Sequence, residues 1–144
     1  MKAVITGGAG FIGSHLAEKL LDSGFEVTIL DNFSTGRLQN LKHLKNKITI
    51  VECDLAVSGE WSNHFKKTDF IFHLASLADI VPSIQDPISY FNSNVLATIN
   101  VLSATRDNKS LKKFIYSASS SCYGIPEIFP TNEESEIDTQ YPYA

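Results

Sequence analysis

Five short apolar runs along the chain predict β-strands. Each run is only a few residues long, is rich in Ile, Val, Leu and Phe, and is separated from the next by a longer stretch of mixed polarity. The first run is followed directly by glycines and is typical of a buried strand. The predicted strands are Lys2–Thr6, Phe25–Leu30, Ile48–Val51, Asp69–Ala75 and Lys112–Ser119.

After the first predicted strand, the apolar spacing changes to that of a helix. Gly24 stands where the C-terminal cap of that helix belongs, because glycine tolerates the left-handed backbone that ends many helices. One face of the predicted helix is formed by Phe11, Ile12, Leu16, Leu20 and Leu21.

The clearest helical pattern begins at Asp86–Pro87 and extends to about Asp107. Aspartate is a favoured N-cap, and proline fits the first helical position, where no backbone N–H is required. Strands that alternate with helices imply right-handed crossovers, so the sequence predicts a doubly wound α/β domain with a parallel sheet covered on both faces. The long helix carries a single apolar stripe, spaced 3, 4, 4 and 3: Ile88, Phe91, Val95, Ile99 and Leu102.

Composition and charge exclude several classes of protein. At 144 residues, with 43% hydrophobic and 19% charged residues, the chain has the size and composition of one globular domain. A net charge of -4 with scattered Lys and Arg argues against a nucleic-acid partner. No apolar stretch is long enough to span a membrane, and the glycine-rich N-terminus does not match a signal peptide. Cys53 and Cys122 fit no metal-ligand spacing. We therefore expect a cytoplasmic protein with reduced thiols and no metal site.

The stretch TGGAGFIG, Thr6 to Gly13, joins the first predicted strand to the first helix. Gly7, Gly10 and Gly13 give G-x-x-G-x-x-G spacing, and starting instead from Gly8 gives G-x-G-x-x-G. Such a turn needs residues free to adopt positive φ, and it brings bare backbone N–H groups to a helix N-terminus, where a diphosphate can bind. The alternative is a glycine-rich turn that binds nothing.

Asp31 ends the second predicted strand, eighteen residues after Gly13. A carboxylate there can accept hydrogen bonds from both adenosine ribose hydroxyls and would repel a 2′-phosphate, which favours NAD over NADP. Arg37 could instead pair with a phosphate, and Asp31 could simply cap its loop. Asp54 follows the third strand and is expected either to contact adenine or to cap a turn.

Taken together, the motifs resemble those of the extended short-chain dehydrogenase/reductases, the family of nucleotide-sugar epimerases and dehydratases. Within that family the chain is most similar to the UDP-sugar 4-epimerases, and the likeness covers essentially the whole chain. It implies a Rossmann-type fold and NAD as cofactor. The motifs are TGGAGFIGSHL, LDNFSTG, CDL, FHLAS, NSNVLATINVL, YSASSSCYG and YPYA.

The resemblance assigns residue roles by position. Ser119 matches the catalytic Ser/Thr, and Tyr143 matches the catalytic tyrosine. Asn94 matches a helix asparagine that faces the cofactor, although from the pattern alone it is a polar residue beside the apolar stripe. The implied cofactor-binding residues are Gly7, Gly10, Phe11, Ile12, Gly13, Asp31, Asn32, Asp54, Leu55, Leu74, Ala75, Ser76, Asn94 and Ser117.

The implied reaction oxidises the sugar at C4 and returns the hydride to the opposite face of the 4-keto intermediate. Tyrosine, with an ordinary pKa of about 10, needs help to act as a base at neutral pH. In the family this help comes from a lysine four positions beyond the tyrosine, whereas this chain ends one position beyond Tyr143. The sequence thus predicts an NAD-binding domain, 1–144, cut within Y-x-x-x-K, that binds NAD without turning over a UDP-hexose. We expect the intact protein to be a homodimer.

Two other functions remain open. A nucleotide-sugar 4,6-dehydratase or decarboxylase of the same family is the first. Dehydratases carry an acid pair directly after the catalytic Ser/Thr, and here those positions are Ser120 and Ser121, which favours epimerisation. The second is a non-catalytic NAD(H)-binding module, which would have no use for Ser119 and Tyr143.

Overall fold

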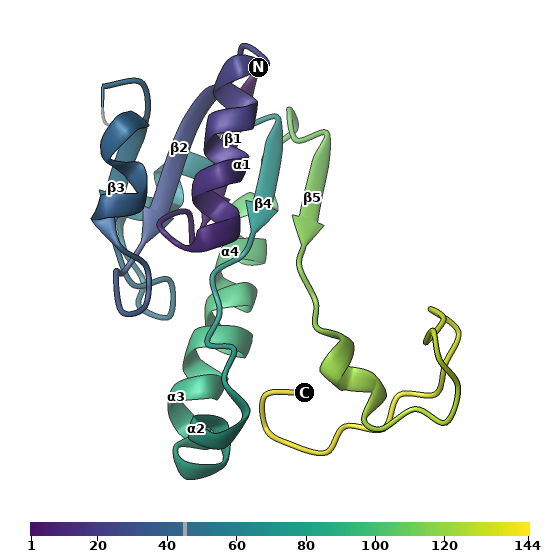
Figure 1. Cartoon of the computed structure of the whole chain (residues 1–144). Coiled ribbons are helices and arrows are strands. Elements are labelled where there is room, and N and C mark those ends of the chain that lie inside the picture. Colours follow the sequence, from purple (N-terminus) through teal and green to yellow (C-terminus); the bar gives the residue numbers. More distant parts are fainter. Residues whose placement is uncertain (45) are drawn as a thin grey trace.

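The apolar runs form one parallel five-stranded sheet in the computed structural model, which describes residues 1–44 and 46–144. The strand order is β3-β2-β1-β4-β5, and every neighbouring pair is parallel, which confirms the predicted doubly wound α/β domain (Figure 1). The strands are β1 Lys2–Thr6, β2 Glu26–Asp31, β3 Thr49–Glu52, β4 Phe70–His73 and β5 Lys113–Tyr116.

β4 and β5 end earlier than the sequence predicts. β1 ends at Thr6 in the glycine turn, so the chain beyond His73 has no neighbouring strand with which to continue its ladder. The Leu74 N–H makes a last ladder bond to the Thr6 carbonyl at 3.1 Å, and the N–H groups of Leu74 and Ala75 both approach the Thr6 hydroxyl, at 3.2 Å each. Ser117 and Ser119 likewise follow β5 instead of belonging to it. The strand tips therefore open into loops, and most of the predicted site residues lie in those loops.

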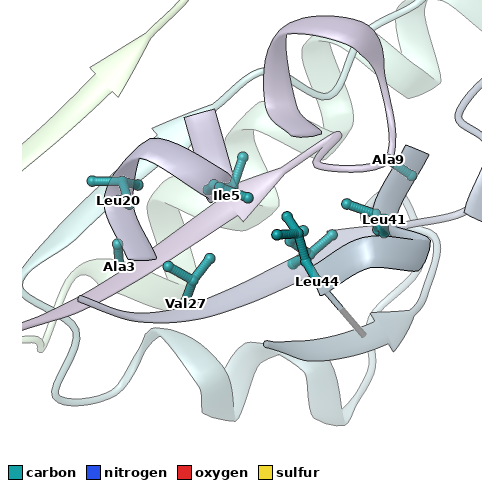
Figure 2. Packing of buried hydrophobic residues seen from close by; sticks show 9 residues of the cluster. Ala3, Ile5, Ala9, Leu20, Val27, Leu41 and Leu44 are labelled. Carbon is teal, nitrogen blue, oxygen red and sulfur yellow. The ribbon is translucent and has the colours of Figure 1, made fainter. Parts of the chain in front are cut away.

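Alternating side chains of the strands build two separate cores on the two faces of the sheet. On one face, α1 (Phe11–Asp22) and the 3-10 helix η1 (Leu38–Leu44) pack over β1 and β2 (Figure 2). On the other face, the 3-10 helix η2 (Glu60–Phe65) and α4 (Ala97–Thr105) supply Trp61, Phe65, Ala97 and Val101. Both faces of the central strands are covered, as expected for a parallel sheet.

The end of α1 confirms the predicted glycine cap. Gly24 has φ +78°, its N–H donates to the Leu21 carbonyl, and the Phe25 N–H donates to the Leu20 carbonyl. These two bonds make a Schellman motif, which satisfies carbonyls that the helix end leaves free. The predicted apolar face is wrong at its start, because Phe11 and Ile12 are 78% and 64% exposed. The buried face is made by Gly13, Ser14, Ala17 and Leu20, and the first three are small enough to let the start of α1 lie close to the sheet.

The long predicted helix forms, with a change of winding in its middle. It comprises α3 (Pro87–Tyr90), a π-helical segment η3 (Phe91–Leu96) and α4, and it follows the short α2 (Ile80–Gln85). Asp86 is its N-cap as predicted, with its carboxylate accepting from the Ser89 N–H. The apolar stripe does not face the sheet. Its members are 44–68% exposed, whereas Tyr90, Ala97, Val101 and Thr105 are buried.

The C-terminal residues 124–144 contain no helix or strand and follow the short 3-10 helix η4 (Ser120–Tyr123). Figure 1 shows this segment turning back toward the end of the molecule that holds α2 and α3. Within the described ranges 1–44 and 46–144, no helix is long and apolar enough to cross a membrane.

Candidate functional site

A cleft at the tips of β1, β2, β3 and β4 brings together most of the residues predicted to bind a cofactor. The carboxyl ends of parallel strands are where ligands of doubly wound sheets bind. The predicted residues that line this first cleft are Gly7, Gly10, Asp31, Asn32, Asp54, Leu55, Leu74, Ala75 and Ser76.

The glycine turn at the floor of the first cleft is held in place by close backbone contacts. Gly7 has φ +67°, and a Cβ there would lie 2.7 Å from the Ala75 nitrogen. A Cβ on Gly13 would lie 2.6 Å from the Gly7 oxygen and from the Gly8 Cα. Gly7 and Gly13 are therefore required by packing alone.

The N-terminus of α1 opens beside this turn. Gly10 is the N-cap residue, and no side chain caps the helix, so the first-turn N–H groups of Phe11, Ile12 and Gly13 have no intrahelical partner. These N–H groups and the positive end of the helix dipole can bind an anionic oxygen. Phe11, Ile12 and Gly13 do not line the first cleft, so their predicted role depends on their backbone.

The Asp31 carboxylate supports the glycine turn directly. One oxygen accepts the Ala9 N–H at 2.8 Å, the other accepts the Phe33 N–H at 2.8 Å, and the residue is 7% exposed. The loop-capping alternative is thus realised in the structure. A carboxylate has about four lone-pair directions, so two remain for ribose hydroxyls. Asp54 also caps a turn, through the Ala56 N–H at 2.8 Å.

A second cleft, of about 640 Å³, continues from the first and shares Leu74, Ala75 and Ser76 with it. Its volume is in the range of small-molecule sites, about 300–1,000 Å³. The predicted residues Asn94, Ser117, Ser119 and Tyr143 all line this second cleft. The structure therefore places nine of the cofactor candidates in the first cleft, and it places Asn94 and Ser117 together with both catalytic candidates in the second.

Asn94 fastens the loop after β4 to the long helix. Its side-chain oxygen accepts the Leu77 N–H at 2.8 Å, and its amide donates to the Leu77 carbonyl at 2.9 Å. Asn94 lies in the π-helical segment η3, and its two hydrogen bonds show that it faces this loop. Asn94 thus lines the second cleft itself, while it holds the backbone at Leu77, which lines the first.

Ser119 and Tyr143 lie in the same cleft without contacting each other. Ser119 is the N-cap of η4: its oxygen accepts the Ser121 N–H at 3.1 Å, and its hydroxyl donates to the Ser121 hydroxyl at 3.0 Å. Ser119 therefore also has a structural role, because it caps the turn that follows β5. Over the described part of the chain, no hydrogen bond joins Ser119 to Tyr143.

His73 is a buried site residue that the sequence did not single out. It is 1% exposed and also lines the second cleft, and its ring nitrogens lie 2.7 Å from the Thr6 hydroxyl and 2.8 Å from the Thr98 hydroxyl. Thr98 donates its own proton to the Asn94 carbonyl, so its oxygen must accept from His73 Nε2, and Nδ1 then accepts from Thr6. Burial lowers the pKa of His73 to about 4. The detectable signal was a histidine within the apolar run DFIFHLA.

Cys53 is a further ionisable group at the site. Burial, followed by the nearby Asp31 and Asp54 carboxylates, raises the pKa of the Cys53 thiol to about 11, so Cys53 is a neutral wall of the first cleft at pH 7. Among the residues that the structure describes, no three His, Cys, Asp or Glu side chains are grouped to hold a metal ion.

Comparison with known proteins shows similarity along almost the whole chain. The chain is 32% identical to the UDP-glucose 4-epimerase of Bacillus subtilis (strain 168), covering 99% of this chain and 44% of that relative. It is 35% identical to the UDP-glucuronic acid decarboxylase 1 of Danio rerio, covering 92% of this chain and 31% of that relative. The chain therefore spans less than half the length of either relative.

The fold is also similar to that of a solved UDP-glucose 4-epimerase. The UDP-glucose 4-epimerase from Bifidobacterium longum in complex with NAD+ and UDP superposes with a TM-score of 0.89, at 27% identity over 99% of this chain and 44% of that protein. The family model described as GDP-mannose 4,6 dehydratase matches residues 4–144. Because that match includes every strand tip, the glycine turn and both clefts, the chain belongs to the GDP-mannose 4,6 dehydratase family, as the resemblance to epimerases and dehydratases implied.

Proposed function

We propose that residues 1–144 form a domain that binds NAD along the strand tips. The observation that carries this proposal is the pairing of two features in the first cleft. The uncapped N-terminus of α1 offers N–H groups to a diphosphate, and the buried Asp31 keeps free lone pairs for a ribose. The nicotinamide end would enter the second cleft past Ala75, beside Ser117.

Asp31 is expected to set the preference for NAD over NADP. Replacing it with Asn removes the negative charge and keeps one acceptor oxygen, so either the Ala9 N–H or the Phe33 N–H also loses its acceptor. Hydrogen bonds to a charged group are worth about 1.5–3 kcal/mol, so we expect a ten- to hundredfold loss of NAD affinity. NADP affinity should fall much less, because the variant no longer repels a 2′-phosphate. Titration calorimetry with both coenzymes measures the ratio of NAD affinity to NADP affinity.

An unchanged NAD-to-NADP ratio in Asp31→Asn would show that Asp31 only supports the loop. Asp22→Asn is the matched control, because Asp22 is an acid at the far end of α1, away from both clefts. Absence of any heat with NAD⁺ or NADH in the unaltered protein would refute the proposed cofactor itself.

For the whole protein we propose epimerisation of a UDP-hexose at C4 through a 4-keto intermediate. Tyr143 would take the proton of the sugar 4-hydroxyl, and Ser119 would hydrogen-bond the same oxygen and the carbonyl that it becomes. NAD, when bound, supplies the hydride acceptor. The presence of both side chains in one cleft next to the shared wall Leu74–Ser76 supports this assignment.

Product analysis separates the proposed reaction from its alternatives. The whole protein, as its own gene encodes it, is incubated with NAD⁺ and UDP-galactose, GDP-mannose or UDP-glucuronic acid. Formation of UDP-glucose supports epimerisation, a 4-keto-6-deoxy sugar would indicate a dehydratase, and release of CO₂ a decarboxylase. Binding of NAD without any of these products would favour a non-catalytic NAD(H)-binding module. The exposed Ser120, where dehydratases have an acid, disfavours dehydration.

We also propose that the protein forms a homodimer through the exposed stripe of the long helix. Ile88, Phe91 and Val95 of this stripe line the second cleft, so we assign the interface to Ile99 and Leu102. These two side chains are 51% and 48% exposed and line neither cleft, and exposed apolar residues that lie together are typical of an interface. Ile99→Lys should shift the protein toward monomers in sedimentation velocity. Ile128→Lys, a matched change at a 74% exposed site outside the stripe, should not. A monomeric unaltered protein would contradict the proposal.

A further inference from the structure

The backbone at Tyr143 is attached to α2, sixty residues earlier in the chain. The Tyr143 N–H donates to the Ser83 hydroxyl oxygen at 3.3 Å. Ser83 is fully buried, and its own hydroxyl donates to the Ile80 carbonyl at 2.6 Å. A buried hydroxyl is costly unless its hydrogen bonds are made, and here one bond stays within α2 while the other reaches the C-terminal segment.

The ring of Tyr143 is attached to the same helical unit through Tyr90. The two ring centroids lie 6.4 Å apart with an interplanar angle of 77°, the edge-to-face arrangement that aromatic pairs prefer. Tyr90 is 5% exposed, and its hydroxyl oxygen accepts the Asp79 N–H at 3.2 Å. Its ring is therefore held in the helix core on one side and presented to Tyr143 on the other.

These contacts tie both sides of the second cleft to one support. The loop Ser76–Asp79 on one side is held at Leu77 by Asn94 and at Asp79 by Tyr90. The Tyr143 segment on the other side is held by Ser83 and Tyr90. Tyr143 is thus held beside the cleft by one contact to α2 and one to α3.

We infer that Ser83 and Tyr90 are positioning residues for Tyr143, one for its backbone and one for its ring. This inference rests on the proposed function for its chemical meaning, because Tyr143 is there the group that removes the sugar proton. A reacting group must be held to within a fraction of an ångström, and a misplacement of about 1 Å can cost a hundredfold in rate. Neither Ser83 nor Tyr90 needs to touch the sugar to have this effect.

The test measures the environment of Tyr143 itself by NMR. In Ser83→Ala, which removes only the hydroxyl, we expect amide hydrogen exchange at Tyr143 to become at least tenfold faster. In Tyr90→Leu, we expect the nuclear Overhauser contacts between the two rings to vanish and the Tyr143 ring shifts to move toward free-tyrosine values. Tyr90→Phe keeps the ring and should restore both signatures. Ser103→Ala, at an exposed site on α4, is the matched serine control.

The inference fails if Ser83→Ala and Tyr90→Leu, each folded by circular dichroism, leave Tyr143 exchange and ring shifts as in the unaltered protein. If Tyr90→Leu unfolds the chain, Ser83→Ala still decides, because it is nearly isosteric and removes only the hydroxyl that accepts the Tyr143 N–H. In the whole enzyme both disruptive variants should lower kcat at least tenfold with KM little changed. A further outcome is that the variants lose the NMR contacts while the unaltered protein neither binds NAD nor turns over a sugar. This outcome would support the positioning of Tyr143 and reject the proposed function.

Discussion

Replacing Gly7 with alanine is expected to lower the free energy of unfolding by about 3–5 kcal/mol, the sum of a backbone term and a packing term. At φ +67° an alanine side chain is strained, and its Cβ would lie 2.7 Å from the Ala75 nitrogen and 2.8 Å from the Leu74 carbonyl carbon. Both obstacles are backbone atoms of the chain that follows β4, so they cannot turn away as a side chain would. Urea denaturation at pH 7 measures the loss.

Gly24→Ala is the control that isolates the backbone term. Gly24 has φ +78°, close to that of Gly7, but a Cβ there meets no atom within 4 Å. It should therefore cost only about 1 kcal/mol. If Gly7→Ala lowered the free energy of unfolding no more than Gly24→Ala does, the close approach of the glycine turn to the chain after β4 would contribute nothing to the cost of the substitution.

Gly10 separates folding from binding within the same turn. Its φ is -74°, and its nearest contact to an added Cβ is the Gly7 oxygen at 3.3 Å, so packing alone tolerates alanine far better there than at Gly7 or Gly13. Gly10 also caps α1 and lines the first cleft. In the proposed binding of NAD, a methyl group at this position would obstruct the approach of the diphosphate to the helix N-terminus, so Gly10→Ala is expected to weaken binding more than folding.

The features that could be predicted from the sequence are those determined by short-range chemistry. Gly24 and Asp86 end and begin helices as expected, because capping depends on a few consecutive residues. The five strands could be predicted because a run of branched and aromatic residues has few alternatives to a buried strand. Asp31 could be placed at a strand tip because it directly follows the second apolar run, Phe25–Leu30.

The features that escaped prediction depend on contacts between distant segments. The stripe through Val95 and Ile99 has the period of a buried face, yet the smaller Ala97 and Val101 pack on the sheet, and periodicity cannot say which face does so. The partner of Ser119 is two residues away, but its capping role depends on where β5 ends. That end is determined by β4 and not by the local sequence.

Acidification from pH 7 to pH 4 is expected to remove about 3 kcal/mol of stability through His73 alone. Burial depresses the folded-state pKa of His73 to about 4 from its ordinary 6.5, so between these values the unfolded chain binds the proton more readily. The stabilisation is fully present above pH 6.5 and is lost as the pH falls toward 4. Equilibrium denaturation in urea at half-unit pH intervals measures the slope.

The hydrogen-bond network explains why the folded state resists protonation of His73. A proton on Nδ1 would face the Thr6 oxygen, whose own proton would then lose its acceptor while the Leu74 and Ala75 N–H groups remain pointed at it. Nε2 cannot accept a hydrogen bond in place of Nδ1, because its partner Thr98 already donates its proton to the Asn94 carbonyl. The charged ring would therefore have to break the network that joins β1, β4 and the long helix.

His73→Phe separates this titration from other acid effects. The variant keeps an aromatic ring against Tyr116, whose centroid lies 5.9 Å from that of His73, but it leaves the Thr6 hydroxyl without its acceptor. It should be less stable at pH 7 by about 1–3 kcal/mol and nearly insensitive to pH between 6.5 and 4.

Hydrogen bonds hold the pKa of Asp69 and of Asp86 below the ordinary 3.8, so their stabilisation is lost only at lower pH. The other three histidines are exposed, so an equally steep slope in His73→Phe would refute the assignment of the acid sensitivity to His73.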